Sequence, residues 1–486
     1  MHHAENKMNF IDLEQDNLYL PDYEDDFSQY EEFMHTTQEE YQTDLNYCIW
    51  PSVESLFKPI GCLLMCCTLL RICYQYDFVF NVKVKHSASI VLGLYVIHFY
   101  FDSELFVYIL GMAALSYFAL SIPNNHIKRF TSLDKGYFAL YSSIVCMILN
   151  ELLTDSEQWN RIRSAVMLIA MKFISLAFDR GNNSKTQLPG FIDYFGYLFS
   201  PSTCIFGPWI SFEEYMVSLQ RIHYSWNWTR SIFASLLWSL VCFILSNCII
   251  TWVLPDSLPG ILLLYRDALI FRTSHYFVSF LSDATCGISG AGSSPGRPLV
   301  RVTSPRLIEI PRSMVQVCVF WNFAMHGWLK KYVFKPTFRV YGSLTAVLMT
   351  YLMSSLLHGL NARLSAVLLS LGCYTYVEYK TRAALSKLFS ACVCSRPCRT
   401  PCHLHKHNRN AFTLFLNFCY TVSVILHLAY LGALIDEASR THDVQYQSSS
   451  FDLWRNFYFF SHIMVFGEFC GCIIIGYITK YYQIKT

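Results

Sequence analysis

YGSLTAVLMTYLMSSLLHGL, residues 341–360, is an apolar run that ends with a histidine, a glycine and a leucine. About 20 mostly apolar residues cross the hydrocarbon core of a bilayer as a helix, so this segment has transmembrane length. An ionisable side chain in such a helix is costly, faces the protein interior and by default indicates function. His358 is therefore the first candidate functional residue. The alternative is a neutral imidazole at a helix end, bonded to a backbone carbonyl.

Eight other apolar runs of spanning or near-spanning length accompany this one. They lie at 59–74, 88–101, 105–122, 136–153, 231–254, 364–378, 411–434 and 457–478. Hydrophobic residues make up 53% of the 486-residue chain and charged residues 15%, which excludes a soluble protein of this size. The runs lack the period-two alternation of a barrel. We therefore expect an all-α, multi-pass membrane protein with about 9–11 transmembrane helices.

Four further apolar segments are shorter or interrupted by polar residues, glycine or proline. They lie at 162–178, 191–212, 259–289 and 313–328. Non-helical backbone at membrane depth is tolerated where protein or a water-filled cavity surrounds it. These segments therefore predict re-entrant or interfacial helices.

Charge is distributed unevenly along the chain. Residues 1–47 contain thirteen Asp and Glu against one Lys, a balance of −12, so the remaining residues carry +14 of the total of +2. Such an acidic segment buries too little apolar surface to fold, and we predict a disordered tail over 1–47 before a membrane domain at 57–486. The segment 380–410 is basic with no acid, which predicts a cytoplasmic loop.

A second polar interruption stands 36 residues before His358. In FWNFAMHGWL, 320–329, Trp321, Asn322 and His326 break an otherwise apolar segment. A buried Asn322 amide needs hydrogen-bond partners. It either links two helices or is directed at a carbonyl or hydroxyl group of a substrate. Pro336 and a basic stretch separate Asn322 from His358, so the two residues belong to different helices.

This Trp-Asn pair, followed by a histidine at the end of an apolar helix, resembles the membrane-bound O-acyltransferase family. Further segments share the resemblance, which extends from about residue 57 to the C-terminus. They are MLIAMKFISLAFD (167–179), YFGYLFSPSTCIFGPWISF (194–212), YFVSFLSDATCGISGAG (276–292), EIPRSMVQVCVFWN (309–322), SLLHG (355–359) and HLAYLGALID (427–436). They are most similar to the branch of the family that attaches palmitoleate to a serine of Wnt proteins.

The resemblance implies an acyl-CoA-dependent protein-serine O-palmitoleoyltransferase of the endoplasmic reticulum membrane, required for Wnt secretion and signalling. Palmitoleoyl-CoA is then a substrate, no cofactor is permanently bound, and the partners are Wnt proteins and membrane lipids, with no nucleic acid. His358 is the expected general base for the serine hydroxyl, a role that suits a neutral imidazole. Asn322 is expected either to stabilise the thioester oxyanion or to position one reactant.

Four other residues are candidates for substrate binding. Trp321 adjoins Asn322, and Trp209 in FGPWISF either lines the substrate path or anchors the chain at the headgroup level. Lys172 either extends to the interface or pairs with a phosphate. Arg312 in EIPRSM precedes the Asn322 helix and is a candidate to bind a coenzyme A phosphate.

A cluster of cysteines and histidines follows within the basic loop. CVCSRPCRTPCHLHKH, 392–407, contains Cys392, Cys394, Cys398, Cys402, His403, His405 and His407. It lacks a clean C-x2-C pair, so we expect no metal site. A basic loop next to the membrane, with cysteines open to lipidation, is the simpler interpretation, and zinc is the alternative.

Two other kinds of function remain open from the sequence. One is another acyltransferase of the same family that acts on a lipid or a different peptide. The other is a protein without catalytic activity, either a transporter or an escort for its partner. Transporters commonly contain inverted repeats, and no convincing internal repeat is found in this sequence.

Overall fold

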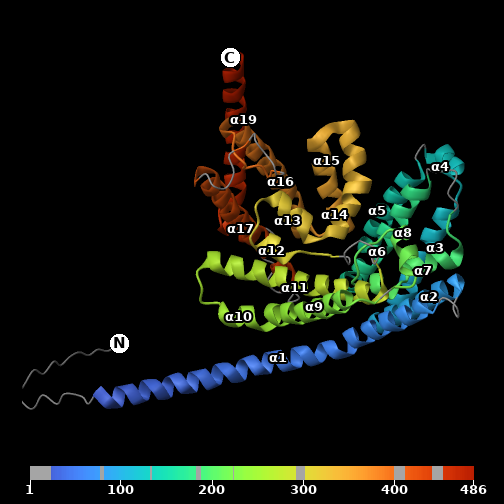
Figure 1. Ribbon diagram of the computed structural model, residues 1–486, viewed down its shortest axis with the longest axis horizontal. Helices are drawn as coiled ribbons and strands as arrows, with labels where there is room; N and C mark the ends of the chain where they lie inside the picture. The colour runs from blue at the N-terminus through green and yellow to red at the C-terminus, as the bar shows by residue number, and fades with distance from the viewer. Residues whose placement is uncertain are drawn as a thin grey trace, which may run out of the picture. The chain divides into compact units, whose positions relative to one another are not determined.

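The computed structural model describes residues 23–76, 81–131, 134–181, 188–222, 224–291, 301–398, 405, 411–440 and 452–485, and Pro51–Thr486 form one compact unit. The regular elements of the described residues are all helices, and these residues contain no strand (Figure 1). The elements are α1 (Tyr23–Gln75), α2 (Val82–Tyr100), α3 (Ser103–Ser121), α4 (Asn124–Thr131), α5 (Lys135–Leu153), α6 (Ser156–Gly181), α7 (Phe191–Leu198), η1 (Pro201–Thr203), α8 (Phe212–Ser218), α9 (Trp226–Ile244), η2 (Leu245–Ile249), α10 (Ile250–Val253), α11 (Gly260–Ser289), α12 (Pro305–Glu309), α13 (Met314–Trp321), α14 (Phe323–Leu329), η3 (Lys330–Phe334), α15 (Lys335–Leu357), α16 (Ala362–Phe389), α17 (Ala411–Arg440), α18 (Asp452–Asn456) and α19 (Phe460–Lys485).

Seven helical segments among the described residues are long and apolar enough to cross a membrane. They are Leu45–Gln75, Ser103–Ser121, Lys135–Leu153, Trp226–Val253, Phe323–Leu357, Ala411–Leu434 and Phe460–Ile478. The chain is therefore a multi-pass, all-helical membrane protein, as predicted, with fewer qualifying spans than the 9–11 expected. The predicted runs at 88–101 and 364–378 lie in α2 and α16. These helices bury Lys85, Glu378 and Arg382 inside the protein.

The first helix begins earlier than the sequence suggests. α1 starts at Tyr23, so its first turns fall in the acidic segment for which we predict disorder. The span Leu45–Gln75 supplies a formed helix, and adding residues to an existing helix is far easier than starting a new one. Residues 1–22 of the predicted tail lie outside the described residues.

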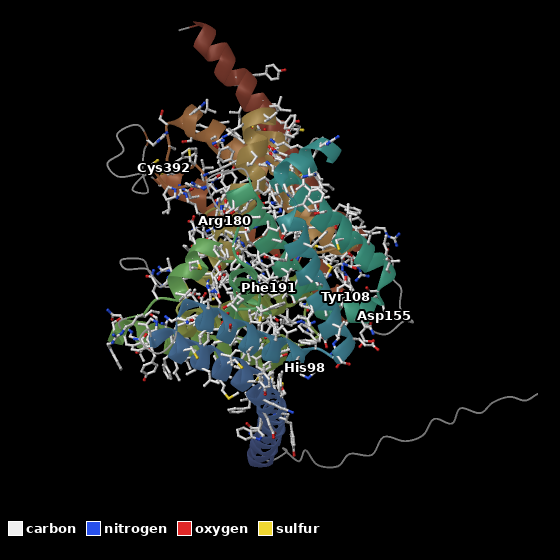
Figure 2. All side chains as sticks on the ribbon, turned by 90° about the vertical axis from the view of Figure 1, so that its right-hand side faces the viewer. His98, Tyr108, Asp155, Arg180, Phe191 and Cys392 are labelled. Carbon is white, nitrogen blue, oxygen red and sulfur yellow. The ribbon has the colours of Figure 1, made fainter. Side chains whose placement is uncertain are left out.

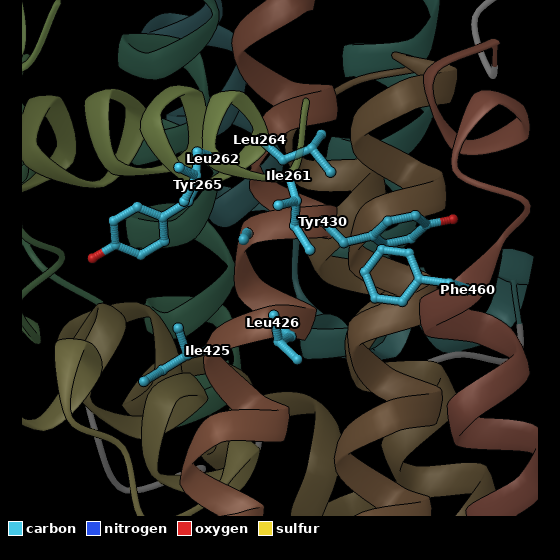
Figure 3. A pocket seen from close by; sticks show the side chains of 9 residues that line it. Ile261, Leu262, Leu264, Tyr265, Ile425, Leu426, Tyr430 and Phe460 are labelled. Atoms are coloured by element: carbon cyan, nitrogen blue, oxygen red, sulfur yellow. The ribbon is translucent and has the colours of Figure 1, made fainter. Parts of the chain in front are cut away.

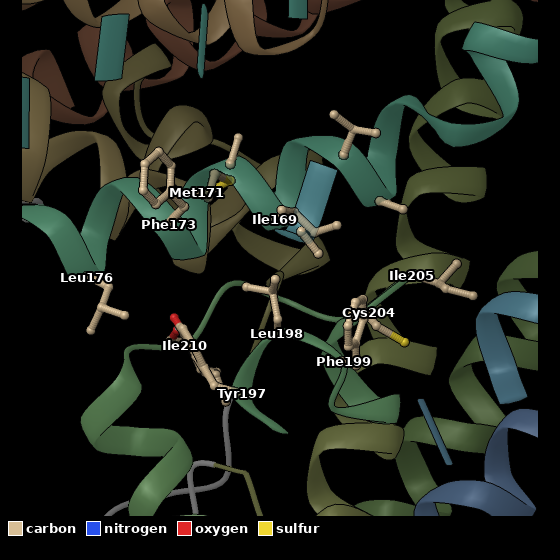
Figure 4. Close-up of a cluster of buried hydrophobic side chains, with 14 of the residues drawn as sticks. Ile169, Met171, Phe173, Leu176, Tyr197, Leu198, Phe199, Cys204, Ile205 and Ile210 are labelled. Atoms are coloured by element: carbon tan, nitrogen blue, oxygen red, sulfur yellow. The ribbon is translucent and has the colours of Figure 1, made fainter. Parts of the chain in front are cut away.

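Two hydrophobic cores hold the membrane unit together. The first core joins α2, α3, α5 and α6 to the 194–219 segment and to Trp328, Tyr332, Met353 and Leu357. Figure 4 shows side chains of α6 and of the 197–210 segment converging in it. The second core gathers Tyr276 of α11, Met314 and Val317 of α13, and residues of α16, α17 and α19. The chain passes from the second core to the first between α13 and α14.

The segment that carries both Asn322 and His358 is a bent helical hairpin. Gly342, with φ 81° and ψ −174°, divides α15 into two helices, and Figure 1 shows the second limb returning beside the first. This backbone conformation is essentially restricted to glycine. At 1.5 Å per residue, 323–341 rises about 28 Å and 343–357 descends about 22 Å. His358 therefore returns to within about 6 Å of the level of Asn322 along the hairpin axis.

Candidate functional site

Asn322 stands at the break between α13 and α14. Its φ of −148° and ψ of 99° are extended, and its Oδ1 accepts a hydrogen bond of 2.9 Å from Met325 N. This is the N-cap arrangement, in which a side-chain oxygen satisfies one of the first N–H groups of a helix. The cap occupies the oxygen, so the Nδ2 group is left to donate. In the part of the chain that the structure describes, Nδ2 has no acceptor.

His358 ends the second limb of the hairpin. Its backbone N donates to Ser354 O and Ser355 O at 3.2 and 3.1 Å, and Gly359 follows with φ +93°. Its imidazole makes no hydrogen bond to any of the described residues. The alternative of a ring held by a backbone carbonyl therefore has no support there, and both ring nitrogens are without a hydrogen-bond partner among the described residues.

Two charged residues on neighbouring helices flank His358. Glu151, at the end of α5, accepts a hydrogen bond of 2.5 Å from Leu360 N and so holds the turn that follows the histidine. Arg163, on α6, lies close enough to His358 to interact with it electrostatically. Sequence reasoning missed both residues. The available signal was a carboxylate at the end of the apolar run 136–153.

His275 connects the two parts of the site. Its ring stacks on the indole of Trp321, with centroids 4.2 Å apart and planes 2° from parallel, and its Nε2 lies 3.0 Å from Trp321 O. His275 is also within electrostatic reach of His358. This histidine on α11 therefore contacts the residue next to Asn322 and interacts electrostatically with His358. The sequence places His275 in a segment far from either, and no spacing signal connects them.

Lys172 and Trp209 occupy the interior of the first core. Lys172 Nζ is fully buried and donates to Tyr197 O, Leu198 O and Thr203 Oγ1 at 2.9 to 3.0 Å, so it does not extend to an interface. Trp209 is half-buried, and its Nε1 donates to Ser175 Oγ at 3.1 Å. Lys172 therefore ties α6 to the end of α7 and to η1, and Trp209 ties the segment after η1 to α6.

Arg312 holds the start of the loop after α16. Its Nε donates to Cys394 O at 3.1 Å and its guanidinium also donates to Cys392 O at 2.7 Å. Cys392 is buried on this loop and is labelled in Figure 2. Cys398 Sγ lies 3.3 Å from His405 Nδ1. Among the described residues no group of three or more His, Cys, Asp or Glu is arranged to hold a metal ion, and Cys402, His403 and His407 lie outside those residues.

An apolar cavity of about 210 Å³ lies between α11, α17 and α19 (Figure 3). Its walls include Leu262 and Tyr265 of α11 and Tyr430 of α17. None of the candidate catalytic residues lines it. Tyr265 precedes His275 by ten residues on the same helix, or about 15 Å at 1.5 Å per residue.

Comparison with known proteins supplies the family. A model of the membrane-bound O-acyltransferase family matches residues 150–389. The chain is 32% identical to the human (Homo sapiens) protein-serine O-palmitoleoyltransferase porcupine, over 90% of this chain and 99% of that protein. It is 37% identical to the Anopheles gambiae porcupine, over 66% of this chain and 70% of that protein, and 34% identical to the Drosophila melanogaster porcupine, over 57% and 58%.

Proposed function

We propose, from the premise that this chain belongs to the membrane-bound O-acyltransferase family and is a protein-serine O-palmitoleoyltransferase, that His358 is its general base and Asn322 its oxyanion donor. Two observations support these roles. The imidazole of His358 has no hydrogen-bond partner among the described residues. The oxygen of Asn322 is occupied by the cap of α14, which leaves its NH₂ group to donate.

In the proposed acyl transfer, the His358 imidazole accepts a proton and the Asn322 amide donates a hydrogen bond. His358 takes the proton of the acceptor serine as its Oγ attacks the thioester carbonyl. The carbonyl oxygen gains negative charge in the tetrahedral intermediate, and the Asn322 Nδ2 group donates a hydrogen bond to it. The intermediate then releases the coenzyme A thiolate, which receives the proton from His358. The products are the serine ester and free coenzyme A.

The substrates in this proposal are palmitoleoyl-CoA and a serine of Wnt proteins, and the location is the endoplasmic reticulum membrane. The relatives named porcupine are protein-serine O-palmitoleoyltransferases, which supports the serine acceptor and the acyl group. Each buried methylene contributes about 0.8 kcal/mol, so an acyl chain of this length favours a membrane-embedded site. Secreted acceptors reach such a site from the lumen.

The four flanking candidates have different parts in the proposal. Trp321 and Trp209 are aromatic walls of the substrate path. Arg312 donates to backbone carbonyls of the loop after α16, and Lys172 to those at the end of α7, so we propose that they shape the substrate path through these segments.

Transfer of tagged palmitoleate from its coenzyme A ester to a Wnt-derived serine peptide tests both roles. Asn322→Asp keeps an oxygen for the helix cap and removes the NH₂ donor, so we expect a loss of about 10²–10³-fold in kcat with an unchanged melting temperature. His358→Ala should lose at least about 10²-fold. If the wild type labels the peptide and either variant retains full activity, the role of that residue is wrong. If the folded wild type does not label the peptide, the substrate assignment is wrong.

A further inference from the structure

The break between α13 and α14 leaves backbone groups that need partners, and three of these groups are paired across the break. Ser304 N donates to Phe320 O at 3.1 Å, and Phe323 N donates to Val302 O at 2.8 Å. The carbonyl oxygen of Trp321 is paired with a side chain, the imidazole of His275. His275 is therefore the side chain that satisfies the peptide immediately before Asn322.

The geometry of His275 defines its state. A carbonyl oxygen only accepts hydrogen bonds, so the 3.0 Å contact with Trp321 O requires a hydrogen on Nε2, and Ser279 Oγ lies farther from the same nitrogen, at 3.4 Å. Phe271 stands one turn earlier on α11, and its ring also stacks on Trp321, with centroids 5.9 Å apart and planes 20° from parallel. Residues four apart share one face of a helix. The Trp321 indole therefore lies along the face of α11 that Phe271 and His275 form.

We propose that His275 is a positioning residue for acyl transfer, which holds the Trp321–Asn322 peptide so that the Asn322 amide stays directed at the reacting carbonyl. The inference rests on the function proposed above and adds a residue on a third element. Its hydrogen bond fixes the carbonyl of residue 321, and its stacked ring fixes the side chain of the same residue. Asn322 follows directly, so a shift of this peptide moves the amide. A misplacement of about 1 Å in a catalytic group can lower the rate by about 10²-fold.

Two kinds of variant separate the hydrogen bond from the packing. His275→Phe keeps an aromatic ring to stack on Trp321 and removes the N–H donor. His275→Gln and His275→Met are unbranched side chains of similar length, of which only Gln has an N–H to donate. We expect His275→Phe and His275→Met to lower kcat by about 10- to 100-fold at unchanged KM for palmitoleoyl-CoA. His275→Gln should retain most of the activity.

His427 supplies a matched control in the second core. It is buried and lies 2.6 Å from Ser461 Oγ and 3.1 Å from Ser423 Oγ, so His427→Phe also removes buried hydrogen bonds. That variant should lower the yield of folded protein and leave kcat per folded enzyme unchanged. Equal kcat for His275→Gln and His275→Met would overturn the inference, because the N–H group would then have no effect.

A double-mutant cycle with Asn322→Asp decides whether His275 acts through Asn322. If it does, His275→Met should lower the residual kcat of Asn322→Asp by less than about 3-fold, since the amide that it positions is already lost. Effects that multiply fully would mean that His275 acts independently of Asn322, and the inference would be wrong. Peptide labelling by the wild type is measured in the same series, so failure of the proposed function is seen separately.

Discussion

Replacing Gly359 by alanine should damage the turn that follows His358. Gly359 has φ +93°, and a non-glycine residue in a left-handed conformation costs about 1–2 kcal/mol. A Cβ atom there would lie 2.6 Å from Glu151 Oε2, closer than real Cβ contacts come. The carboxylate must then withdraw from Leu360 N, and loss of that hydrogen bond costs about 1 kcal/mol more. Together the two effects destabilise the turn by about 2–3 kcal/mol.

The measurement is the melting temperature in detergent together with kcat for peptide palmitoleoylation. Gly359→Ala should lower both, since the distorted turn adjoins the general base. Gly342→Ala meets no atom within 4 Å and has φ +81°, so it should lose stability through backbone strain alone. Gly111→Ala adds a methyl group to α3 with nothing within 4 Å and should be neutral or slightly stabilising.

The contact with Glu151 is tested by a double-mutant cycle. In a Glu151→Ala background the Cβ at position 359 has no carboxylate to displace, so Gly359→Ala should cost only the backbone strain. The coupling between the two substitutions should be about 1 kcal/mol. Strictly additive effects, or a Gly359→Ala protein as stable and active as the wild type, would refute the reasoning.

Three further substitutions have defined outcomes. Lys172→Met leaves three buried acceptors without their donor, at about 1–3 kcal/mol each, so the yield of folded protein by size-exclusion chromatography should fall sharply. A normal yield would mean that the three hydrogen bonds of Lys172 do not stabilise the fold. Arg312→Gln should release the loop after α16 and raise the alkylation rate of the buried Cys392 at least about 10-fold by peptide mass spectrometry, whereas an unchanged rate would mean that the loop is held elsewhere. Trp328→Phe removes the 3.1 Å hydrogen bond to Met171 O and should cost about 1 kcal/mol in unfolding free energy, seen as a lower melting temperature.

Most of the helical architecture is predictable from apolar runs, and the exceptions have physical causes. α2 and α16 miss the hydropathy of a span because they contain charged residues, among them the buried Lys85, Glu378 and Arg382. A linear average of hydropathy counts a buried charge in the same way as an exposed one. The turn at Gly342 is equally invisible, because a glycine inside an apolar run is compatible with a continuous helix. Runs of hydrophobic residues therefore predict membrane helices and leave the hairpin undetected.

The residues of the candidate site fall into two groups, those that the sequence predicts and those that it does not. Asn322 and His358 stand out because a polar side chain within an apolar segment is rare, and this signal is local. The helix cap at Asn322 also has a local signal, since asparagine before a helical stretch favours the N-cap. His275 and Glu151 act through contacts with residues 46 and 209 positions away, and pairing over such distances leaves no trace in a single sequence.

The passage of the chain from one hydrophobic core to the other at Asn322 has a genetic consequence. The position of the amide depends on how α13 is seated in the second core and how α14 is seated in the first. A selection for restored secretion of an acylated reporter, started from a weakened Trp321 variant, should therefore yield suppressors in both cores. They should include large-to-small or small-to-large replacements near Val317 in the second core and near Met353 in the first. The activity of this enzyme then depends on the packing of both hydrophobic cores together. Related sequences that have changed in one core should therefore carry compensating substitutions in the other.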